Sequence, residues 1–389
     1  MAEPQRIALV WEQFAPYHVD RCAAVAARLG DRADVHCIEV APASQAYAWE
    51  VSGDVPGAEK TVLFPGRIAE NVSRAARYRS LHRTLESADL VVIGLPSSAP
   101  DIAWLARSLR RSGKRVYFCS DSKADDYPRS SIHEALKRVV LRSYDGGIVA
   151  GPRSRDYYCS LGVAREKLWP GYDTLSTARV RTRAADAAPL EWKDRAFVFL
   201  GRFVEKKAVD VLLRAYAAYR EISGEPRDLV LAGDGPLRSA LEAQTQALGI
   251  ARHVRWTGFL PESAAAQEMA RALALVLPSR EEQWGLVVNE AVALRIPVIA
   301  SAQVGAVDLL VDEGQTGYVV ETGSVPALTE ALLAMAADKD RWAKMAAHSA
   351  DKDWLADSER FADTIEAILF PDSGANRSVE RLLEAFETP

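Results

Sequence analysis

The chain has 389 residues, of which 49% are apolar and 26% are charged, so it holds enough apolar material for two globular domains. The formal net charge is −5 and the isoelectric point is about 5.8, which argues against nucleic acid as a partner. The first residues do not read as a signal peptide and no apolar run approaches membrane-spanning length, so we expect a cytoplasmic protein. The four cysteines are scattered, which favours buried free thiols over disulfides or a zinc site.

The first half of the chain alternates short apolar runs with amphipathic stretches. The runs predict strands that are buried on both faces, and the stretches between them predict helices. This alternation is typical of an α/β domain with a parallel sheet, in which ligands bind beyond the carboxyl ends of the strands. The expected strands are 7–10, 34–40, 61–64, 90–93, 116–119 and 147–150, and the expected helices are 17–29, 71–86, 102–111 and 133–143.

A second alternating series follows residues 176–193, which lose the periodicity and are interpreted as an interdomain linker. We therefore predict one Rossmann-like domain over 1–175, a second over 194–355, and amphipathic tail helices within 356–389. The strands expected in the second series are 196–200, 229–232, 254–256, 273–277, 317–320 and one opened by Pro297, and the helices are 209–222, 236–248, 264–272, 325–337 and one that starts after Gly285.

The densest group of candidate binding residues lies where a central strand of the second series meets the next helix. The first turn of a helix presents unpaired N–H groups and partial positive charge, so the loop at Trp284, Gly285 and Leu286 could hold a diphosphate. Glu282 and Glu290 would then lie on either side of the anion, where carboxylates accept hydrogen bonds from sugar or ribose hydroxyls. Solvated surface glutamates are the alternative, and for an isolated pair the more frequent case.

Glu282 and Glu290 stand in the stretch P-S-x-x-E-x-W-G-x4-E-A, which resembles the E-x7-E signature of the retaining glycosyltransferases of family 4. The resemblance implies the GT-B fold, in which two Rossmann-like domains face across a cleft and the last helices cross back onto the first domain. It also implies that Glu282 contacts the donor sugar and that Glu290 binds the ribose of a nucleotide diphosphate sugar. Uridine diphosphate is the commonest donor nucleotide of that family.

A second matching segment, from Gly201 to Lys207, directly follows a predicted strand. Arginine and lysine can bind a diphosphate there, the first through a planar fork and the second as a point charge, although basic residues after a strand are more often simply solvated. The family's G-R-[LF]-x3-K-G segment implies that Arg202 and Lys207 contact the donor phosphates and that Gly201 lies beside them. The family glycine after the lysine is Ala208 here, so Lys206 could share or replace the contact of Lys207.

Further loops resemble the family less specifically. Gly233 opens a G-D-G-P turn that matches the family's G-x-G-P loop beside the nucleotide, although a plain tight turn explains it almost as well. Trp256 stands where the family surrounds the base. Gly305 falls near a family glycine-rich loop, but the following spacing differs by about a residue, and no role is assigned to Asp308.

The resemblance fades in the first domain, which selects the acceptor. Its first loop lacks the paired glycines that family members often have, and we take His18 and Asp121 as candidate acceptor contacts. For His18, capping or packing of the first helix is the alternative. Asp121 could instead cap a helix or pair with Lys123. A small molecule, a lipid and a glycan all remain possible acceptors.

Family resemblance implies transfer with retention by a front-face route, in which the leaving diphosphate oxygen takes the acceptor proton. Arg202, Lys207 and the N–H groups at Gly285 and Leu286 would stabilise the negative charge that grows on the diphosphate. No D-x-D motif stands at a strand end, so we expect metal-independent activity and no cofactor. A nucleotide-sugar epimerase or a noncatalytic nucleotide-sugar-binding protein of the same fold is the alternative.

The charge is unevenly distributed. Residues 1–175 carry 24 Lys+Arg and 21 Asp+Glu, a net charge of +3, and subtraction from the totals of 48 and 53 leaves 24 and 32, a net charge of −8. The basic excess could face an acidic acceptor or the inner surface of an anionic membrane, although solvated helix faces are the more frequent explanation. The residues concerned are Arg74, Arg77, Arg79, Arg83, Arg107, Arg110, Arg111, Lys114 and Arg115.

Overall fold

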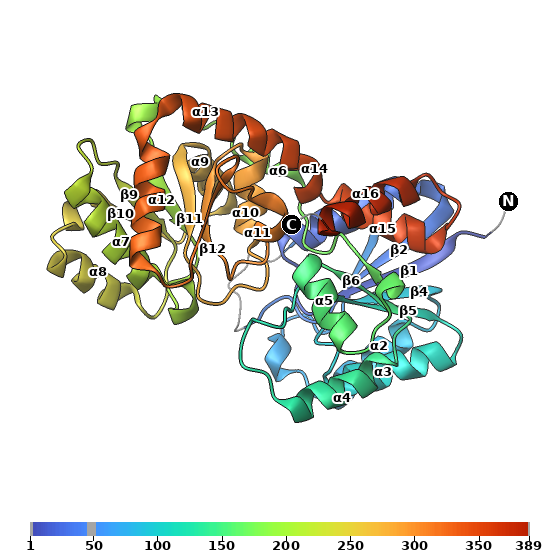
Figure 1. The fold of residues 1–389 in the computed structure, drawn as a ribbon. Helices are drawn as coiled ribbons and strands as arrows, with labels where there is room; N and C mark the ends of the chain where they lie inside the picture. Colours follow the sequence, from blue (N-terminus) through green and yellow to red (C-terminus); the bar gives the residue numbers. More distant parts are fainter. Residues whose placement is uncertain (1–2, 45–51, 388–389) are drawn as a thin grey trace. The chain divides into compact units, whose positions relative to one another are not determined.

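The computed structural model describes residues 3–44 and 52–387, which form two compact units (Figure 1). Unit 1 holds the residues up to Ala124, Pro128–Ser176 and the residues from Ser358 onward, whereas unit 2 holds Asp125–Tyr127 and Thr177–Asp357. The main chain thus enters unit 2 after Ser176 and returns to unit 1 after Asp357. None of the described helices is long and apolar enough to cross a membrane.

Unit 1 is built on a seven-stranded sheet in the order β3-β2-β1-β4-β5-β6-β7, and every pairing in it is parallel. Its central strand β4 is apolar and buried at all four positions, as expected for a strand with helices on both faces. The strands are β1 (Gln5–Trp11), β2 (Ala33–Glu39), β3 (Glu59–Val62), β4 (Leu90–Ile93), β5 (Arg115–Ser120), β6 (Gly146–Val149) and β7 (Leu168–Trp169).

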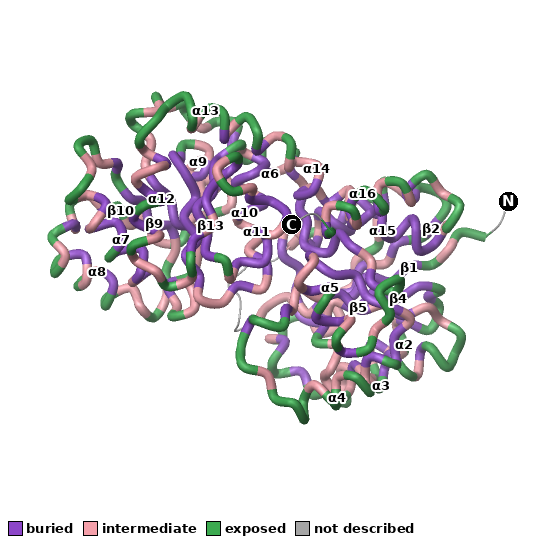
Figure 2. The backbone as a smooth tube through the Cα atoms, viewed as in Figure 1, coloured by how far each residue is buried: buried purple, intermediate pink, exposed green. Residues whose placement is uncertain are grey.

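The helices of unit 1 cover this sheet, and the burial pattern in Figure 2 places its core along the strands. One helix was not predicted: P-R-S-R-D-Y-Y-C-S forms α5, although its apolar residues have no helical spacing. The helices are α1 (Pro16–Leu29), α2 (Arg74–Thr84), α3 (Pro100–Arg111), α4 (Ser131–Leu141), α5 (Pro152–Ser160), α15 (Glu359–Leu369) and α16 (Ala375–Glu387).

Unit 2 contains a six-stranded parallel sheet in the order β10-β9-β8-β11-β12-β13, so both sheets confirm the predicted α/β class. Its strands are β8 (Ala196–Leu200), β9 (Leu229–Ala232), β10 (Val254–Gly258), β11 (Ala272–Leu277), β12 (Val298–Ser301) and β13 (Gly317–Val320). Its helices are α6 (Thr177–Arg183), α7 (Val209–Ile222), α8 (Arg238–Ala247), α9 (Glu262–Ala270), α10 (Leu286–Ala293), α11 (Val307–Leu310), α12 (Val325–Ala337), α13 (Lys339–His348) and α14 (Asp353–Ala356).

The segment 176–193, which we expected to be an irregular connection, contains α6. Thr177 and Val180 of this helix are buried, and α6 packs against α9 and α10 inside unit 2. Arg181 pairs with Asp353 at 2.8 Å between Nη1 and Oδ1. The short helix escaped prediction because the segment T-A-R-V-R-T-R offers only one large apolar side chain to a periodicity count.

The C-terminal helix α15 packs against α1 of unit 1, and a group of charged residues joins the two helices. Arg28 of α1 forms ion pairs with Asp363 and with Glu359 of α15. The Asp363 side chain is only 3% exposed and also pairs with Arg360 at 3.0 Å, whereas the Glu359 side chain is 44% exposed. The two carboxylates thus share one arginine but differ in burial.

This difference predicts unequal costs of removing the two carboxylates. Asp363→Ala should lower the free energy of unfolding of unit 1 by about 2–3 kcal/mol, because it removes a buried carboxylate on which the partly buried guanidinium groups of Arg28 and Arg360 converge. Glu359→Ala should cost less than about 1 kcal/mol, as solvent-screened ion pairs do. Urea unfolding of both variants checks this, and equal losses would show that burial of Asp363 does not govern the contact.

Candidate functional site

The candidate site lies on unit 2, at the carboxyl ends of the three neighbouring strands β9, β8 and β11. Because parallel strands end at the same edge of a sheet, the loops that follow them emerge side by side. These are the loops 201–208 after β8, 233–236 after β9 and 278–285 after β11. The sequence had assigned donor-binding residues to all three.

The loops after β8 and β9 touch at two glycines. A Cβ atom on Gly233 would lie 1.9 Å from the carbonyl oxygen of Gly201, so no side chain fits there. The Gly201 N–H donates to the carbonyl of Ala232 at 3.0 Å, and the Phe203 N–H donates to that of Asp234 at 2.9 Å. The glycine at position 233 is therefore explained by this close approach, and a tight turn alone does not account for it.

Lys207 and Glu282 meet between the loops after β8 and β11. The Lys207 ammonium donates a hydrogen bond to Oε2 of Glu282, and the side chains are only 16% and 12% exposed. Ser279 donates a second hydrogen bond to the same carboxylate oxygen at 3.1 Å. Ser301 Oγ in turn donates to the carbonyl of Ser279 at 2.5 Å. Two of the three predicted catalytic residues are thus brought together, and the third, Arg202, lies exposed in the loop after β8.

Arg280 also links the loop after β11 to the loop after β8 and to the first turn of α7. Its guanidinium donates two hydrogen bonds to the Asp210 carboxylate, at 2.9 and 2.8 Å, and the backbone N–H of Arg280 donates to the carbonyl of Lys206 at 2.7 Å. Burial raises the pKa of Asp210, but the hydrogen bonds and charge of Arg280 outweigh it, so the pKa is lowered overall. This two-bond contact, called the Arg280–Asp210 fork below, was not predicted, because nothing in the spacing of the two residues links them.

Gly285 ends the loop after β11 and is the N-cap of α10. Its φ of 98° lies in the left-handed region, and a Cβ there would approach Leu277, Val304 and Glu282 at 3.2–3.3 Å. The first N–H groups of a helix have no partner within the helix, so the N-terminus that begins at Leu286 can accept an anion. The position therefore favours glycine for its conformation, and a Cβ would also be in tight contact with these side chains.

Trp284 has a structural side chain. It is 5% exposed, and its indole Nε1 donates to Oδ1 of the buried Asn289 at 3.0 Å. Asn289 Nδ2 donates to the carbonyl of Ala356 at 3.3 Å, which ties the loop to α14. Any contact of Trp284 with the nucleotide-sugar donor would therefore have to come from its backbone. Glu290 follows Leu286 by four residues on α10 and is neither buried nor fully exposed.

Trp256, in the middle of β10, forms an aromatic and cationic cluster in the same unit. The ring of Phe203 meets it edge to face at 5.5 Å between centroids, and the Arg238 guanidinium lies 4.6 Å from its centre. Phe203 stands two residues after Gly201, so the cluster adjoins the loop after β8. The partly buried ring of Trp256 is therefore fixed from two sides.

The candidate acceptor residues lie in unit 1. His18 is buried in α1, and its Nδ1 accepts a hydrogen bond from the Ala15 N–H at 2.9 Å. Burial, aided by the nearby charge of Arg21, holds the pKa of His18 well below its ordinary value, so the ring is neutral and Nε2 carries its hydrogen. The structure therefore shows the capping role that the sequence left open, and an acceptor contact of His18 stays a prediction.

Asp121 follows β5 and is partly buried, with its carbonyl accepting from Ser154 Oγ at 2.9 Å. The charge of Asp121 affects the pKa of Asp173, a buried residue that the sequence analysis did not single out. Burial and the charge of Asp121 raise the pKa of Asp173, against the opposing charge of Arg21 at 3.5 Å. In the described residues, no group of three or more His, Cys, Asp or Glu side chains could hold a metal ion.

Ala208 occupies the position of the glycine in the resembled segment. It is buried at the N-terminus of α7 with φ 53° and ψ 36°, a left-handed conformation. A side chain in this conformation costs roughly 1–2 kcal/mol, which explains why glycine suits the position. The chain keeps the backbone turn that follows Lys207 although it lacks the glycine.

Known proteins match both the sequence and the fold. Residues 181–351 match the family model Glycosyl transferases group 1. The chain is 30% identical over 293 residues to the GDP-mannose-dependent alpha-(1-6)-phosphatidylinositol monomannoside mannosyltransferase of Mycolicibacterium smegmatis, across 72% of this chain and 75% of the relative. It is 33% identical over 160 residues to the Alpha-D-kanosaminyltransferase of Streptomyces kanamyceticus, a match that spans only 40% of each protein.

Two solved structures share the arrangement of elements at lower identity. HepE of Anabaena, solved in complex with UDP, has a TM-score of 0.68 at 17% identity, covering 94% of this chain and 99% of that one. Sucrose-phosphate synthase of Thermosynechococcus elongatus has a TM-score of 0.68 at 20% identity, covering 95% and 100%. These likenesses establish the fold.

The left-handed alanine leads to a stability prediction. Ala208→Gly should raise the free energy of unfolding by about 0.5–1 kcal/mol, because relief of the strained conformation exceeds the loss of one methyl group. Ala218→Gly, in the interior of the same helix, should lower it by about 1 kcal/mol. Urea unfolding of the two variants checks the signs, and a destabilising Ala208→Gly would contradict the strain.

Proposed function

Because the chain belongs to the group 1 family of glycosyltransferases, we propose that it transfers a sugar from a nucleotide diphosphate sugar to an acceptor hydroxyl with retention at the anomeric carbon. The observation that carries this proposal is the Lys207–Glu282 pair between the loops after β8 and β11. The fold is GT-B, as the resemblance implied. An epimerase or a noncatalytic binding protein is not favoured, because the relatives named above are transferases.

In this proposal the donor diphosphate lies over the N-terminus of α10, with the N–H groups of Gly285 and Leu286 toward it. Lys207 and Arg202 supply positive charge beside the phosphates, and Lys206 is the alternative cation in the same loop. Glu290, one turn inside α10, would bind the ribose hydroxyls. The base of the nucleotide would lie between the loop after β9, at Gly233, and the cluster around Trp256.

The chemistry asked of these groups is the stabilisation of a leaving diphosphate. As the glycosidic bond to the diphosphate breaks, negative charge grows on its oxygen, and fixed cations and N–H groups lower the energy of that state without reorganising. The acceptor hydroxyl attacks from the same face and gives its proton to the departing oxygen. Glu282, already hydrogen-bonded to Lys207 and Ser279, is placed to accept a hydroxyl of the sugar.

These cationic groups would take the place that a metal ion has in other transferases, so we propose turnover without a metal. For the nucleotide we propose uridine diphosphate, which HepE binds in its solved complex. The Mycolicibacterium relative is named as GDP-mannose-dependent, which makes guanosine diphosphate the competing assignment. Its name gives a lipid as the acceptor, which supports the lipid among the small-molecule, lipid and glycan acceptors expected for unit 1.

Nucleotide binding tests the donor site. At about a hundred times its dissociation constant, the correct nucleoside diphosphate should stabilise the protein by about 2.7 kcal/mol. We expect this for UDP in a thermal-shift titration with EDTA present, and we expect Glu290→Gln to weaken it about tenfold through the lost ribose contact. Stabilisation by GDP alone would reassign the base, and stabilisation that requires magnesium would contradict metal independence.

Measurement of kcat tests whether Glu282, and not the adjacent Glu281, takes part in sugar transfer. Glu282→Gln should lower kcat for nucleoside diphosphate release by about a hundredfold, because the variant loses a charged contact at the reacting sugar. Glu281→Gln, the adjacent and partly buried carboxylate, is the matched control and should keep kcat within about twofold. A loss shared equally by both variants would remove Glu282 from the donor site.

A further inference from the structure

Helix α4 of unit 1 has its apolar side chains on the outside. Of its eleven residues only Leu141 is buried. Ile132, Leu136 and Val139 are 77%, 57% and 60% exposed, and their spacing of four and three residues puts them on one face of the helix. We call these three residues the α4 stripe. Exposed apolar residues that form one stripe are a mark of an interaction surface.

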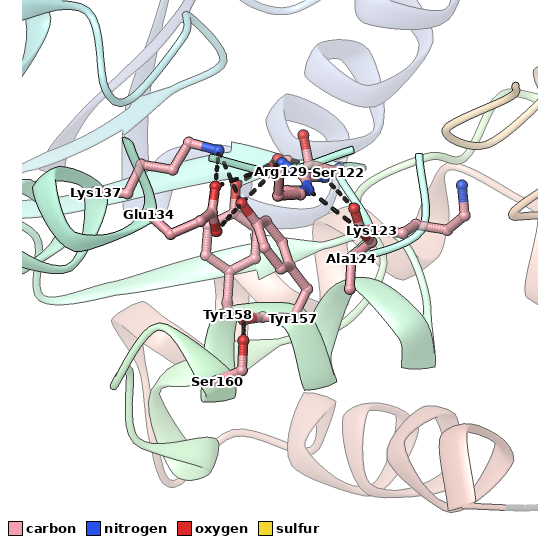
Figure 3. Close-up of polar contacts among 10 residues, drawn as sticks. Ser122, Lys123, Ala124, Arg129, Glu134, Lys137, Tyr157, Tyr158 and Ser160 are labelled. Carbon is pink, nitrogen blue, oxygen red and sulfur yellow. Dashed lines mark hydrogen bonds and ion pairs between the residues drawn. The ribbon is translucent and has the colours of Figure 1, made fainter. Parts of the chain in front are cut away.

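The inner face of α4 is polar, and a hydrogen-bond network fixes it (Figure 3). Lys137 Nζ donates to the hydroxyl of Tyr157 on α5 at 2.8 Å, and this hydroxyl donates to Glu134 Oε2 at 2.8 Å. Lys137 also donates to Glu134 Oε1 at 2.9 Å. Burial and the hydrogen bond to Glu134 raise the pKa of Tyr157, so the hydroxyl keeps the proton that it donates.

Arg129, in the loop that precedes α4, completes the network. Its Nη1 donates to the Tyr157 hydroxyl at 2.8 Å, and its guanidinium lies 4.2 Å from the centre of the Tyr157 ring. It also donates to the carbonyl of Lys123. Turning the α4 stripe inward would break all these contacts, so the outward orientation is built into the fold.

The surface around the α4 stripe is basic. Residues 74–142 carry 14 Lys+Arg and 7 Asp+Glu, a net charge of +7. Arg138 of α4 and Arg142, which directly follows it, are exposed, as are Arg107 and Arg111 of α3. Arg110 of α3 links the two helices, since its Nη1 donates to the carbonyl of Arg142 at 2.8 Å. Several of the basic residues singled out from the sequence are instead paired inside the unit: Arg77 with Asp101, Arg110 with Asp145, and Lys114 with the carbonyl of Ala88.

A groove next to this surface adds aromatic and cationic groups. It lies between α2 and α3, has a volume of about 520 Å³, and is lined by Arg74, Tyr78, Arg79 and Trp104 among others. Trp104 is 59% exposed. Tryptophan and tyrosine favour the boundary between an apolar phase and water, where arginine can reach phosphate groups.

We propose that the α4 stripe docks on the surface of a bilayer containing anionic phospholipids, with its three aliphatic side chains at the acyl boundary and the surrounding arginines on the lipid phosphates. With eleven residues, α4 is about 16 Å long, so it lies on a bilayer and does not cross it. A second copy of the chain fits less well, because a symmetric contact would set the same arginines against each other.

Vesicle flotation of the full chain tests this inference independently of turnover. The protein should float with phosphatidylcholine vesicles that contain phosphatidylglycerol, bind pure phosphatidylcholine far less, and lose binding at high salt. Replacing Ile132, Leu136 and Val139 together by serine should reduce the partition coefficient at least tenfold, because even partial burial of three aliphatic side chains at the acyl boundary contributes more than this factor. Arg138→Ser should reduce it about fivefold.

The matched control is Ile222→Ser, which removes an aliphatic side chain that is 65% exposed on α7 of unit 2 and should leave flotation unchanged. An unchanged far-ultraviolet circular dichroism spectrum and a cooperative unfolding transition in each variant show that the fold is kept. Equal flotation of the triple variant and wild type, equal binding to both vesicle types, or no binding at all would overturn the proposal. So would a lipid-free dimer, seen by light scattering, that the triple variant converts to a monomer.

Discussion

The ion pair between Lys207 and Glu282 is the interaction on which the proposed donor site of unit 2 depends. The side chains are 75 residues apart in sequence, and they meet because β8 and β11 are neighbours in the sheet. Each is mostly shielded from water, and a charge in such a place is strongly unfavourable without a partner. Ser279 and the Arg280–Asp210 fork fix the same loops, so the groups are in position before a ligand arrives.

In the proposed function, this preorganisation concentrates the donor chemistry of a group 1 glycosyltransferase in three loops. The loop after β8 brings a cation, the loop after β11 brings a carboxylate and a helix N-terminus, and the loop after β9 contributes glycine backbone. Gly233 is needed because the loops approach too closely for a Cβ atom, and Gly285 is favoured because its φ of 98° lies in the left-handed region. The left-handed Ala208 shows that the turn after Lys207 is kept even where the residue suits it poorly.

Much of the fold could be predicted from the sequence, because strands such as β4 and β11 are unbroken apolar runs and only a parallel sheet buries both of their faces. Family motifs implied that Glu282 and Lys207 contact the same donor, but they did not predict the ion pair between the two side chains. The Arg280–Asp210 fork could not be predicted, since two charged residues on separate elements carry no spacing signal. Helix α4 shows another limit: periodicity tells which side chains share a face, but only the partners of Glu134 and Lys137 decide which face turns inward.

The most direct test of the donor site is a calorimetric comparison of UDP binding by wild type, Lys207→Met and Lys206→Met. We predict that Lys207→Met weakens binding at least about tenfold, because the charge beside the phosphates is lost, and that Lys206→Met changes it less than about twofold. The double variant Lys207→Met/Glu282→Gln, which leaves no unpaired buried carboxylate, separates lost binding from lost folding. Equal losses in the two single variants, or a larger loss in Lys206→Met, would contradict the assignment of Lys207 to the donor phosphates.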